Sequence, residues 1–385
     1  MTNWLTQEEA RTALGVRQQT LYAYVSRGQI GVCSDPDHPR RSLYLAEDIA
    51  NLVKKRERGR KHNIIAASTM SWGEPIITTA ISTIAKGRLY YRGKDAVALA
   101  ETASLEDAAE LLWEAPSPPH FSAGRPNPSS NESPRSRAFT MLGMAAASGN
   151  PAYGRTPSSL REDAAALVGG LASAFGGIAD DEVPLHQRLA AAWSRDGTSA
   201  DLIRRALVLL ADQELTSSAF AARVTASTGA SLGACALTGL ATLSGPLHGD
   251  ATVRVRSLFE EVERTDADSA VCRYLASGIP IPGFGHPLYP DGDPRAAALL
   301  AAFDLPINFD RMVSKVGTLT GLRPTIDVAL AALVTRCQLP ADAAFALFAI
   351  GRSVGWLAHS IEQVTTGTLI RPRARYTGPP LATLD

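Results

Sequence analysis

Apolar residues recur with the period of an α-helix along most of the sequence from Leu160 onward. Two segments show the pattern most clearly: Leu202, Ala206, Leu209 and Leu210, and Ile326, Leu330, Leu333 and Val334. Residues spaced in this way share one face of a helix, and such faces are stable when they pack against one another. The pattern therefore predicts an all-α fold for the bulk of the chain.

Length and charge limit the classes of protein that this chain can be. It has 385 residues, enough for a sizeable core and for roughly two or three domains. Its 38 lysines and arginines balance its 38 aspartates and glutamates, so the molecule as a whole is not a polycation. A nucleic-acid partner would need a local basic patch.

The cysteines and histidines indicate neither disulfides nor a metal. Cys33, Cys235, Cys272 and Cys337 lie far apart and form no CxxC pair. No clustered spacing of His, Cys, Asp and Glu suggests a metal site either. We therefore expect no metal and a reducing, cytoplasmic location.

No membrane segment is expected. The opening residues MTNWLTQEEA are polar and acidic, unlike a signal peptide. Val224 to Leu247 contains no charged residue and is long enough to consider as a span, but it is mostly Ala, Gly, Ser and Thr and is broken at Gly245-Pro246. A close-packed buried helix is the better interpretation.

The N-terminal segment predicts two short helices around a turn. Thr6 and Glu9 form a capping-box pair, and Gly15 lies at the break between the helices. A plausible hairpin and a third helix follow. Over roughly residues 1–56 this arrangement resembles the winged helix-turn-helix of MerR-type regulators and excisionases. We assign residues 1–61 to this domain and a basic linker.

If this domain binds DNA, the start of its second helix would face the bases. The candidate base-contacting residues are Arg17, Gln18, Gln19 and Thr20, and Arg40 and Arg41 would contact phosphates. The alternative is a small helical appendage that packs or oligomerises without touching DNA.

Two histidines lie in Gly/Pro-rich breaks between helices, where free backbone N–H groups favour anions. They are His248 in SGPLHGDA and His286 in PGFGHPLY. Asp327, in RPTIDVALAAL, lies near the start of an apolar helix. Three arginines follow in conspicuous motifs: Arg295 in DPRA, Arg352 in AIGRSVGWLAH and Arg371 in LIRPRARYTGP. Each residue alone is weak evidence, but their order and spacing together are a strong signal.

In that order and spacing the chain resembles the citrate synthase family from about Trp72 to the C-terminus. The motifs that carry the resemblance are GRLYYRG, SLEDAAELLW, SSAFAARV, GPLHG, PGFGH, DPRA, PTIDVAL, GRSVGWLAHSIEQ and IRPRARYTGP. The resemblance implies an all-α homodimer, or a higher homo-oligomer, over residues 62–385. It also implies a large domain of about residues 62–248 and 335–385 and a small domain of about residues 249–334.

The resemblance also implies catalytic roles in a Claisen condensation. Asp327 would take a proton from the thioester methyl group while His248, as a neutral donor, supports the thioester oxygen. His286 would polarise the ketone of a 2-oxo acid such as oxaloacetate. Hydrolysis of the product thioester would then drive the reaction forward.

Substrate contacts follow from the same resemblance. Arg295, Arg352 and Arg371 would bind the carboxylates, with Arg371 reaching the neighbouring subunit's site. Coenzyme A would be a cosubstrate, its adenine near the backbone of Ile281, Pro282 and Gly283, and no tightly bound cofactor is expected.

Three departures from the family pattern stand out. Gln213 stands where a substrate-binding histidine is common, so this position can donate a hydrogen bond but carries no charge. Asp250 and Thr252 change the run after His248, and Pro287 follows His286.

Three functions therefore stay open. The favoured one is synthesis of citrate from acetyl-CoA and oxaloacetate; 2-methylcitrate synthesis from propionyl-CoA differs by one methylene, which is worth only about 1–3 kcal/mol in a binding site. The third is a DNA-binding regulator whose synthase-like region senses a ligand, because Gln213 and the N-terminal domain both favour it.

Overall fold

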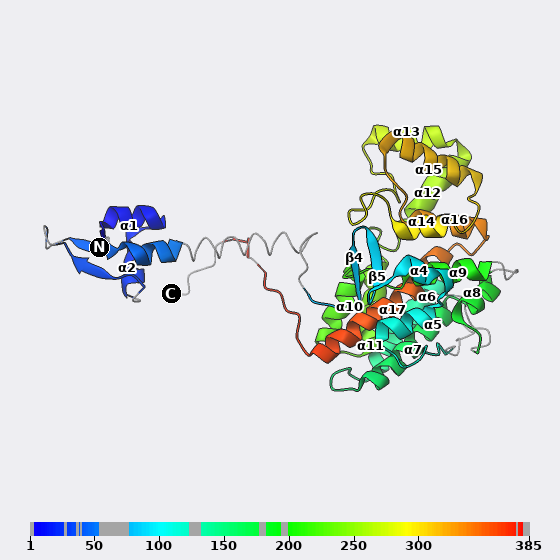
Figure 1. Ribbon diagram of the computed structural model, residues 1–385, viewed down its shortest axis with the longest axis horizontal. Helices are drawn as coiled ribbons and strands as arrows, with labels where there is room; N and C mark the ends of the chain where they lie inside the picture. The colour runs from blue at the N-terminus through cyan, green and yellow to red at the C-terminus, as the bar shows by residue number, and fades with distance from the viewer. Residues whose placement is uncertain are drawn as a thin grey trace. The chain divides into compact units, whose positions relative to one another are not determined.

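The computed structural model describes residues 4–26, 29–35, 38, 41–53, 77–122, 132–176, 182–193, 199–374 and 376–379. It divides into two compact units, Met1–Thr78 and Thr79–Asp385 (Figure 1). The sequence-based boundary at residue 61 lies outside the described residues.

The first unit combines short helices with a three-stranded antiparallel sheet in the order β1-β3-β2. Its elements are β1 Trp4–Leu5, α1 Gln7–Leu14, α2 Gln18–Ser26, β2 Val32–Ser34, β3 Ser42–Leu45 and a helical stretch over residues 46–53. The capping box is confirmed, because Thr6 N–H donates to the Glu9 carboxylate at 2.8 Å and the Thr6 hydroxyl accepts from Glu9 N–H at 3.4 Å. Gly15 ends α1 with a φ of 59°, the left-handed conformation that glycine adopts readily.

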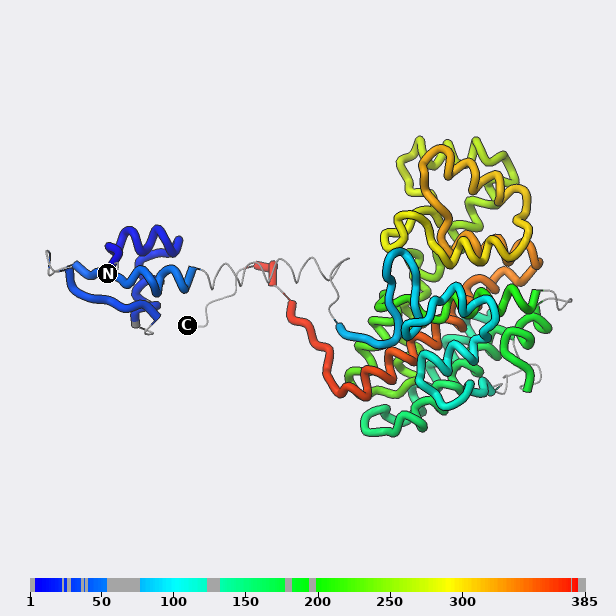
Figure 2. The backbone as a smooth tube through the Cα atoms, in the orientation of Figure 1, coloured from blue at the N-terminus to red at the C-terminus, as the bar shows by residue number. Residues whose placement is uncertain are grey.

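The second unit is mostly helical, as the periodicity predicted. Its helices are α4 Ala96–Thr102, α5 Leu105–Trp113, α6 Pro134–Ser148, α7 Pro157–Ala174, α8 Leu185–Trp193, α9 Ser199–Leu210, α10 Ser217–Ser227, α11 Leu232–Leu243, α12 Ala251–Arg264, α13 Ala267–Ser277, α14 Pro294–Leu300, α15 Ile307–Thr320, α16 Ile326–Arg336 and α17 Ala343–Thr366. Figure 2 traces the same backbone as a tube.

The expectation of an all-α fold for the bulk of the chain is wrong for one small sheet in the second unit, whereas the sheet of the first unit contains an antiparallel hairpin, β2-β3, where the sequence predicted one. In the second unit, β4 Ser82–Ala85, β5 Arg88–Tyr91 and β6 Lys94–Asp95 form an antiparallel meander. Lys86 and Gly87, in the turn between β4 and β5, both have positive φ, 50° and 72°. Two-residue turns of this kind match the twist of paired strands, so local turn chemistry produces a hairpin here.

The second unit contains two hydrophobic cores. The larger core includes α17 and the helices around it, and the smaller one is built by α12, α13, α15 and α16. In Figure 1, α12, α13 and α15 lie together, apart from α5, α7 and α11. Helix α16 contributes Leu330 to the larger core and Ala332 to the smaller one. In its first turn Ile326 and Ala329 belong to the larger core and Val328 to the smaller one, so this turn lies where the two cores meet.

Within the described residues, one helix is long and apolar enough to cross a membrane by length and composition alone. It is α17, and the whole of its apolar window is buried inside the protein, as expected for a core helix. The uncharged stretch from Val224 to Leu247 is not one helix, because Gly229 adopts a φ of 80° between α10 and α11. Close packing is confirmed for α11, where a Cβ on Gly233 would lie 2.5 Å from the backbone of Ala145.

Candidate active site

His248 lies in the turn between α11 and α12. Its Nε2 is 2.7 Å from the Ser218 hydroxyl oxygen, and its ring meets Phe348 edge-on with centroids 6.0 Å apart. Burial, together with the positive charge of Arg352, lowers the pKa of His248 to about 4. The imidazole is therefore neutral near pH 7 and retains one N–H donor.

Asp327 lies in the first turn of α16, at the junction of the two cores. The Thr325 hydroxyl donates to its Oδ2 at 3.0 Å, whereas the buried Oδ1 has no hydrogen-bond partner among the described residues. Burial raises the pKa of Asp327 to about 6. A carboxylate with one open oxygen and this pKa is suited to accept a proton as a general base.

His286 lies in the loop between α13 and α14. Its Nδ1 accepts the backbone N–H of Leu288 at 3.1 Å, so the neutral ring carries its hydrogen on Nε2. Burial, with a contribution from Arg295, lowers the pKa of His286. This histidine therefore presents a neutral N–H donor through Nε2.

Gln213, in the loop between α9 and α10, contacts two of the other candidates. Arg295 donates from Nη1 to the Gln213 carbonyl oxygen, which fixes the orientation of the amide. The amide nitrogen then lies 3.5 Å from Nε2 of His286. Because both groups are donors, they cannot bond to each other, and an oxygen acceptor of a ligand would complement them.

Asp293 is a site residue that sequence reasoning missed. Its buried carboxylate accepts Nε of Arg295 at 3.0 Å and Nη2 at 2.8 Å, and it also accepts the backbone N–H of Ile326 at 3.1 Å. One carboxylate thus holds Arg295 and the residue that precedes Asp327. Asp-Pro at a helix start predicts only an N-cap, so the available signal indicated a structural role.

Arg352 is fully buried on α17. Its Nε donates to the carbonyl of Leu210 at 2.9 Å and its Nη1 to the Thr216 hydroxyl at 3.4 Å. Its Nη2 has no partner among the described residues. Burial lowers the pKa of Arg352 to about 10, so it stays charged at neutral pH and fits an anionic ligand.

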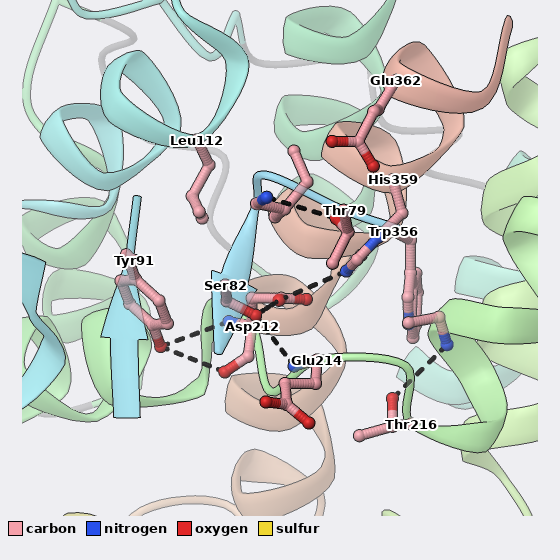
Figure 3. Close-up of polar contacts among 12 residues, drawn as sticks. Thr79, Ser82, Tyr91, Leu112, Asp212, Glu214, Thr216, Trp356, His359 and Glu362 are labelled. Carbon is pink, nitrogen blue, oxygen red and sulfur yellow. Dashed lines mark hydrogen bonds and ion pairs between the residues drawn. The ribbon is translucent and has the colours of Figure 1, made fainter. Parts of the chain in front are cut away.

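A buried polar network fixes the residues on either side of Gln213 (Figure 3). Asp212 accepts the Ser82 hydroxyl, and its Oδ2 lies 3.3 Å from Nε2 of His359. On the other side, Glu214 donates its N–H to Ser82 at 2.9 Å and has a φ of 53°, a strained value for a residue other than glycine. The hairpin strand β4 therefore positions the loop that carries Gln213, a link that the sequence did not indicate.

Arg371 lies apart from this cluster, whereas Gly283 bonds to the residues at the start of α16. Arg371 is exposed in the segment after α17, and no hydrogen bond or ion pair joins it to the described site residues. Ile281 belongs to the smaller core, and Pro282 next to it is also buried. Gly283 has a φ of 80°, and its carbonyl accepts the N–H of Thr325 at 2.8 Å.

The candidate DNA-contacting residues lie in the first unit. Arg17, Gln18, Gln19 and Thr20 are exposed around the start of α2, and Arg41 is exposed at the start of the hairpin strand β3. The Gln18 amide donates to the Tyr22 hydroxyl at 2.7 Å. Arg40 lies outside the described residues.

The second departure from the family pattern adds no unpaired charge. Asp250 forms an ion pair with Arg135 of α6 at 3.0 Å, and the Arg135 guanidinium lies 4.2 Å from the centroid of the Phe345 ring. Pro287 is exposed.

Among the residues that the structure describes, no three His, Cys, Asp or Glu side chains gather in a way that could hold a metal ion.

The model of the citrate synthase C-terminal domain matches residues 176–373, just over half of the 385 residues. The chain belongs to the citrate synthase family. All three histidine and aspartate candidates, and the four substrate-binding candidates, fall inside the matched range.

Solved citrate synthase structures share the fold. The enzyme from Thermotoga maritima superimposes with a TM-score of 0.68 at 25% identity, covering 81% of this chain and 96% of that one. The enzyme from Thermoplasma acidophilum, solved as a ternary complex with carboxymethyl coenzyme A and oxaloacetate, gives a TM-score of 0.67 at 24% identity and covers 80% and 95%. The citrate synthase fold therefore accounts for the described second unit.

Sequence relatives are matched over a shorter stretch. Citrate synthase of Haloferax volcanii is 36% identical over 194 residues, 46% of this chain and 50% of that protein. 2-Methylcitrate synthase 2 of Corynebacterium glutamicum is 29% identical over 185 residues, 45% and 48% of the two chains. The chain thus spans about half the length of the curated relatives it matches.

Proposed function

We propose that the chain catalyses a citrate-synthase-type condensation, joining acetyl-CoA to oxaloacetate and releasing citrate and coenzyme A. The observation that carries the proposal is Asp327, a buried carboxylate with one open oxygen, at the junction of two cores. Arg295 and Asp293 act electrostatically on both Asp327 and His286, so these two candidates share one electrostatic environment. Family membership supports the same activity.

In the proposed reaction, Asp327 takes a proton from the methyl group of acetyl-CoA. His248 donates its N–H to the thioester oxygen, where negative charge develops, and a neutral imidazole suits this role. The methyl carbon then bonds to the ketone carbon of oxaloacetate, and the ketone oxygen takes a proton from His286. Water cleaves the thioester of the product, which releases coenzyme A.

The proposed oxo-acid contacts come from Gln213, His286, Arg352 and Arg295. Arg352 supports the assignment most strongly, because its Nη2 is a buried cationic donor with no acceptor in the described part of the chain. Arg295 donates three hydrogen bonds to Asp293 and Gln213, so its main contribution is to orient Gln213. We assign coenzyme A as a cosubstrate near the backbone of Ile281–Gly283 and propose no tightly bound cofactor.

We propose the same domain division that the family resemblance implied, with a large domain of about residues 62–248 and 335–385 and a small domain of about residues 249–334. The two hydrophobic cores support this division, since the smaller core draws its members from Val255 to Ala332. His248 then lies at the first point where the chain passes between domains, and Asp327 lies at the start of α16, the helix whose other end reaches the second point. Closure of the small domain would bring the two substrates together.

We propose a homodimer as the working assembly. Large apolar side chains are exposed on the second unit, including Met144 at 68%, Tyr153 at 78% and Leu247 at 90%. Large apolar side chains that are this exposed are candidates for contact with another subunit. A dimer would also bring the exposed Arg371 of one subunit to its partner's site.

All four cysteines are free thiols, which fits the proposed cytoplasmic location.

Release of the coenzyme A thiol tests the proposed activity. Purified protein mixed with acetyl-CoA and oxaloacetate should release thiol and form citrate in equal amounts. Propionyl-CoA in parallel decides between citrate and 2-methylcitrate synthesis, and a panel of 2-oxo acids tests the choice of acceptor. No thiol release above background for any pair would remove the enzyme proposal.

The exposed start of α2 favours a second function for the first unit, binding of duplex DNA. Two helices followed by a hairpin and a third helix support a winged helix-turn-helix arrangement, with Arg17 and Gln19 facing bases and Arg41 a phosphate. The full chain should then bind its own upstream DNA more weakly as salt rises, and Arg17→Ala should weaken it further. Binding that neither salt nor Arg17→Ala affects would contradict this function. A chain that binds DNA but releases no thiol would be the ligand-sensing regulator.

A further inference from the structure

Tyr289 is a buried residue that the proposed reaction does not yet use. Its side chain is 2% exposed, and its phenol oxygen is buried without a hydrogen-bond partner among the described residues. Folded proteins seldom leave a buried hydroxyl unpartnered, because the group loses its hydrogen bonds to water and gains none in return. Such a group calls for an explanation.

Tyr289 lies within the proposed oxo-acid site. Its backbone N–H donates to the carbonyl of His286 at 2.9 Å, and the two rings have centroids 5.0 Å apart. The guanidinium carbon of Arg295 is 5.5 Å from the centroid of the Tyr289 ring. Arg352 also acts electrostatically on the hydroxyl. A hydrogen bond, a ring contact and the charges of two arginines therefore connect Tyr289 with the residues assigned to the oxo acid.

Of the acceptors that act on or lie near Tyr289, those of Asp293 and Gln213 already receive donors of Arg295, and one oxygen of Glu214 receives the N–H of Ile84. Both carboxylate oxygens of Asp293 accept hydrogen bonds from Arg295, and the Gln213 carbonyl oxygen accepts a third. Arg352 likewise has a buried donor, Nη2, that meets no acceptor within the described ranges. Burial raises the pKa of Tyr289 to about 12, so its hydroxyl keeps its proton at neutral pH.

The neighbourhood therefore has more donors than acceptors. The open or unmatched donors are the Tyr289 hydroxyl, Arg352 Nη2, the Gln213 amide and His286 Nε2. A ligand that complements them must be rich in acceptor oxygens and negatively charged, and a 2-oxo acid supplies a ketone oxygen and a carboxylate in one plane. We propose that Tyr289 is a substrate-contacting residue that donates its hydroxyl to the carboxylate of the 2-oxo acid, beside Arg352. This proposal rests on the proposed function, because it adds a contact to the same site.

The variant Tyr289→Phe tests the contact, because it removes only the hydroxyl. The KM for oxaloacetate should rise about tenfold or more, the usual effect of losing a hydrogen bond to a charged group. The KM for acetyl-CoA should not change. The Tm of the unliganded protein should stay the same or rise, since the variant removes an unpartnered polar group. An unchanged KM for oxaloacetate would overturn the proposal, and so would a fall in Tm without a change in that KM.

Tyr91→Phe is the matched control for stability. The Tyr91 hydroxyl is also buried but is fully bonded, donating to the carbonyl of Val208 at 3.0 Å and accepting the N–H of Asp212 at 3.2 Å. Its loss should lower the Tm, which shows that the measurement detects a structural hydroxyl.

Calorimetric titration with oxaloacetate separates this proposal from the proposed function. If the wild-type protein releases no thiol, the synthase proposal fails, and binding alone then decides the role of Tyr289. Weaker binding of oxaloacetate to Tyr289→Phe than to the wild type supports the contact. Equal binding by the two proteins, or no binding by either, overturns it.

Discussion

Burial of Asp327 should affect both the rate of the proposed reaction and the stability of the fold. A base must be deprotonated to work, so kcat/KM should fall about tenfold per pH unit below pH 6, where burial places its pKa. His248, with a pKa of about 4, stays neutral over that range and should not contribute. Measurement of kcat/KM against pH with the wild-type protein tests this fall. A profile that stays flat down to pH 5 would contradict the assignment.

Stability gives an independent test of the same carboxyl. Its pKa is raised from 3.8 to about 6 in the folded chain, so its favourable contribution is complete below pH 4 and is lost as pH rises through 6. Asp327→Asn should therefore stabilise the protein by about 1–3 kcal/mol at pH 8 and by little at pH 4. Urea unfolding at the two pH values measures the difference. Equal changes in the free energy of unfolding at pH 4 and pH 8 would show that Asp327 is not a buried, charged carboxylate at pH 8.

Gln213 should make binding of the oxo acid insensitive to protonation at that position. Gln213→His introduces an ionisable donor, and a charged imidazole beside the substrate carboxylate should lower the KM for oxaloacetate about tenfold at pH 6 but not at pH 8.5. Steady-state kinetics at both pH values measures the effect, with the KM for acetyl-CoA as control. If the KM of Gln213→His for oxaloacetate is identical at pH 6 and pH 8.5, the contact between residue 213 and the substrate is contradicted.

Some site residues could be identified from the sequence and others could not. His248, His286 and Asp327 stand in motifs whose glycines, prolines and order mark them. Asp293 and Tyr289 stand in the same motifs, DPRA and PGFGHPLY, but their residue types indicate no role there, because an aspartate before a helix usually caps it and a tyrosine usually packs in a core. Their roles depend on which partners the fold leaves them, and only three-dimensional structure gives that information.

The close contact between α17 and the loop that carries Gln213 depends on Gly355. A Cβ at this position would lie 2.3 Å from Oδ1 of Asp212, and the Gly355 N–H donates to the carbonyl of Ala211 at 2.9 Å. Gly355→Ala should force the helix and loop apart, destabilise the protein by about 1–3 kcal/mol and lower kcat/KM. Chemical denaturation and thiol release measure the two effects.

Gly317→Ala is the matched control for this prediction. Gly317 also lies within a helix, α15, but its added Cβ would have its nearest neighbour at 3.9 Å. This variant should stabilise the protein by about 0.5–1 kcal/mol, because alanine favours the helix and meets no clash. Similar stability changes in the two variants would show that Gly355 is not in close contact with the loop.

Elements with strong local signals could be predicted, but elements set by contacts elsewhere in the chain could not. The period around Leu202–Leu210 corresponds to α9 and that around Ile326–Val334 to α16. The sheet β4-β5-β6 was not predicted, because its strands are short and the sequence signal for it lies in two-residue turns. Its function in holding the 212–214 loop rests on Ser82, a small polar residue with no motif of its own.

At the scale of the whole molecule, the proposed dimer can be tested through activity. If Arg371 serves the partner's site, a mixed dimer of Arg371→Ala and Asp327→Asn contains one complete site. Co-expression of the two inactive variants should therefore restore about one quarter of the wild-type activity, since about half of the dimers are mixed and each has one of two sites. If Arg371 serves its own subunit, the mixture stays inactive. Light scattering of the wild-type chain checks the assembly separately.

The central claim is that Asp327 removes the proton that starts carbon–carbon bond formation. Its most direct measurement is the rate of thiol release from acetyl-CoA with oxaloacetate, compared between the wild type and Asp327→Asn after calorimetry has confirmed that both bind oxaloacetate equally. We predict that the variant loses at least about a thousandfold in kcat, since the removal of a general base and of its charge leaves the methyl proton in place. A variant that binds oxaloacetate and releases thiol at the wild-type rate would contradict the account.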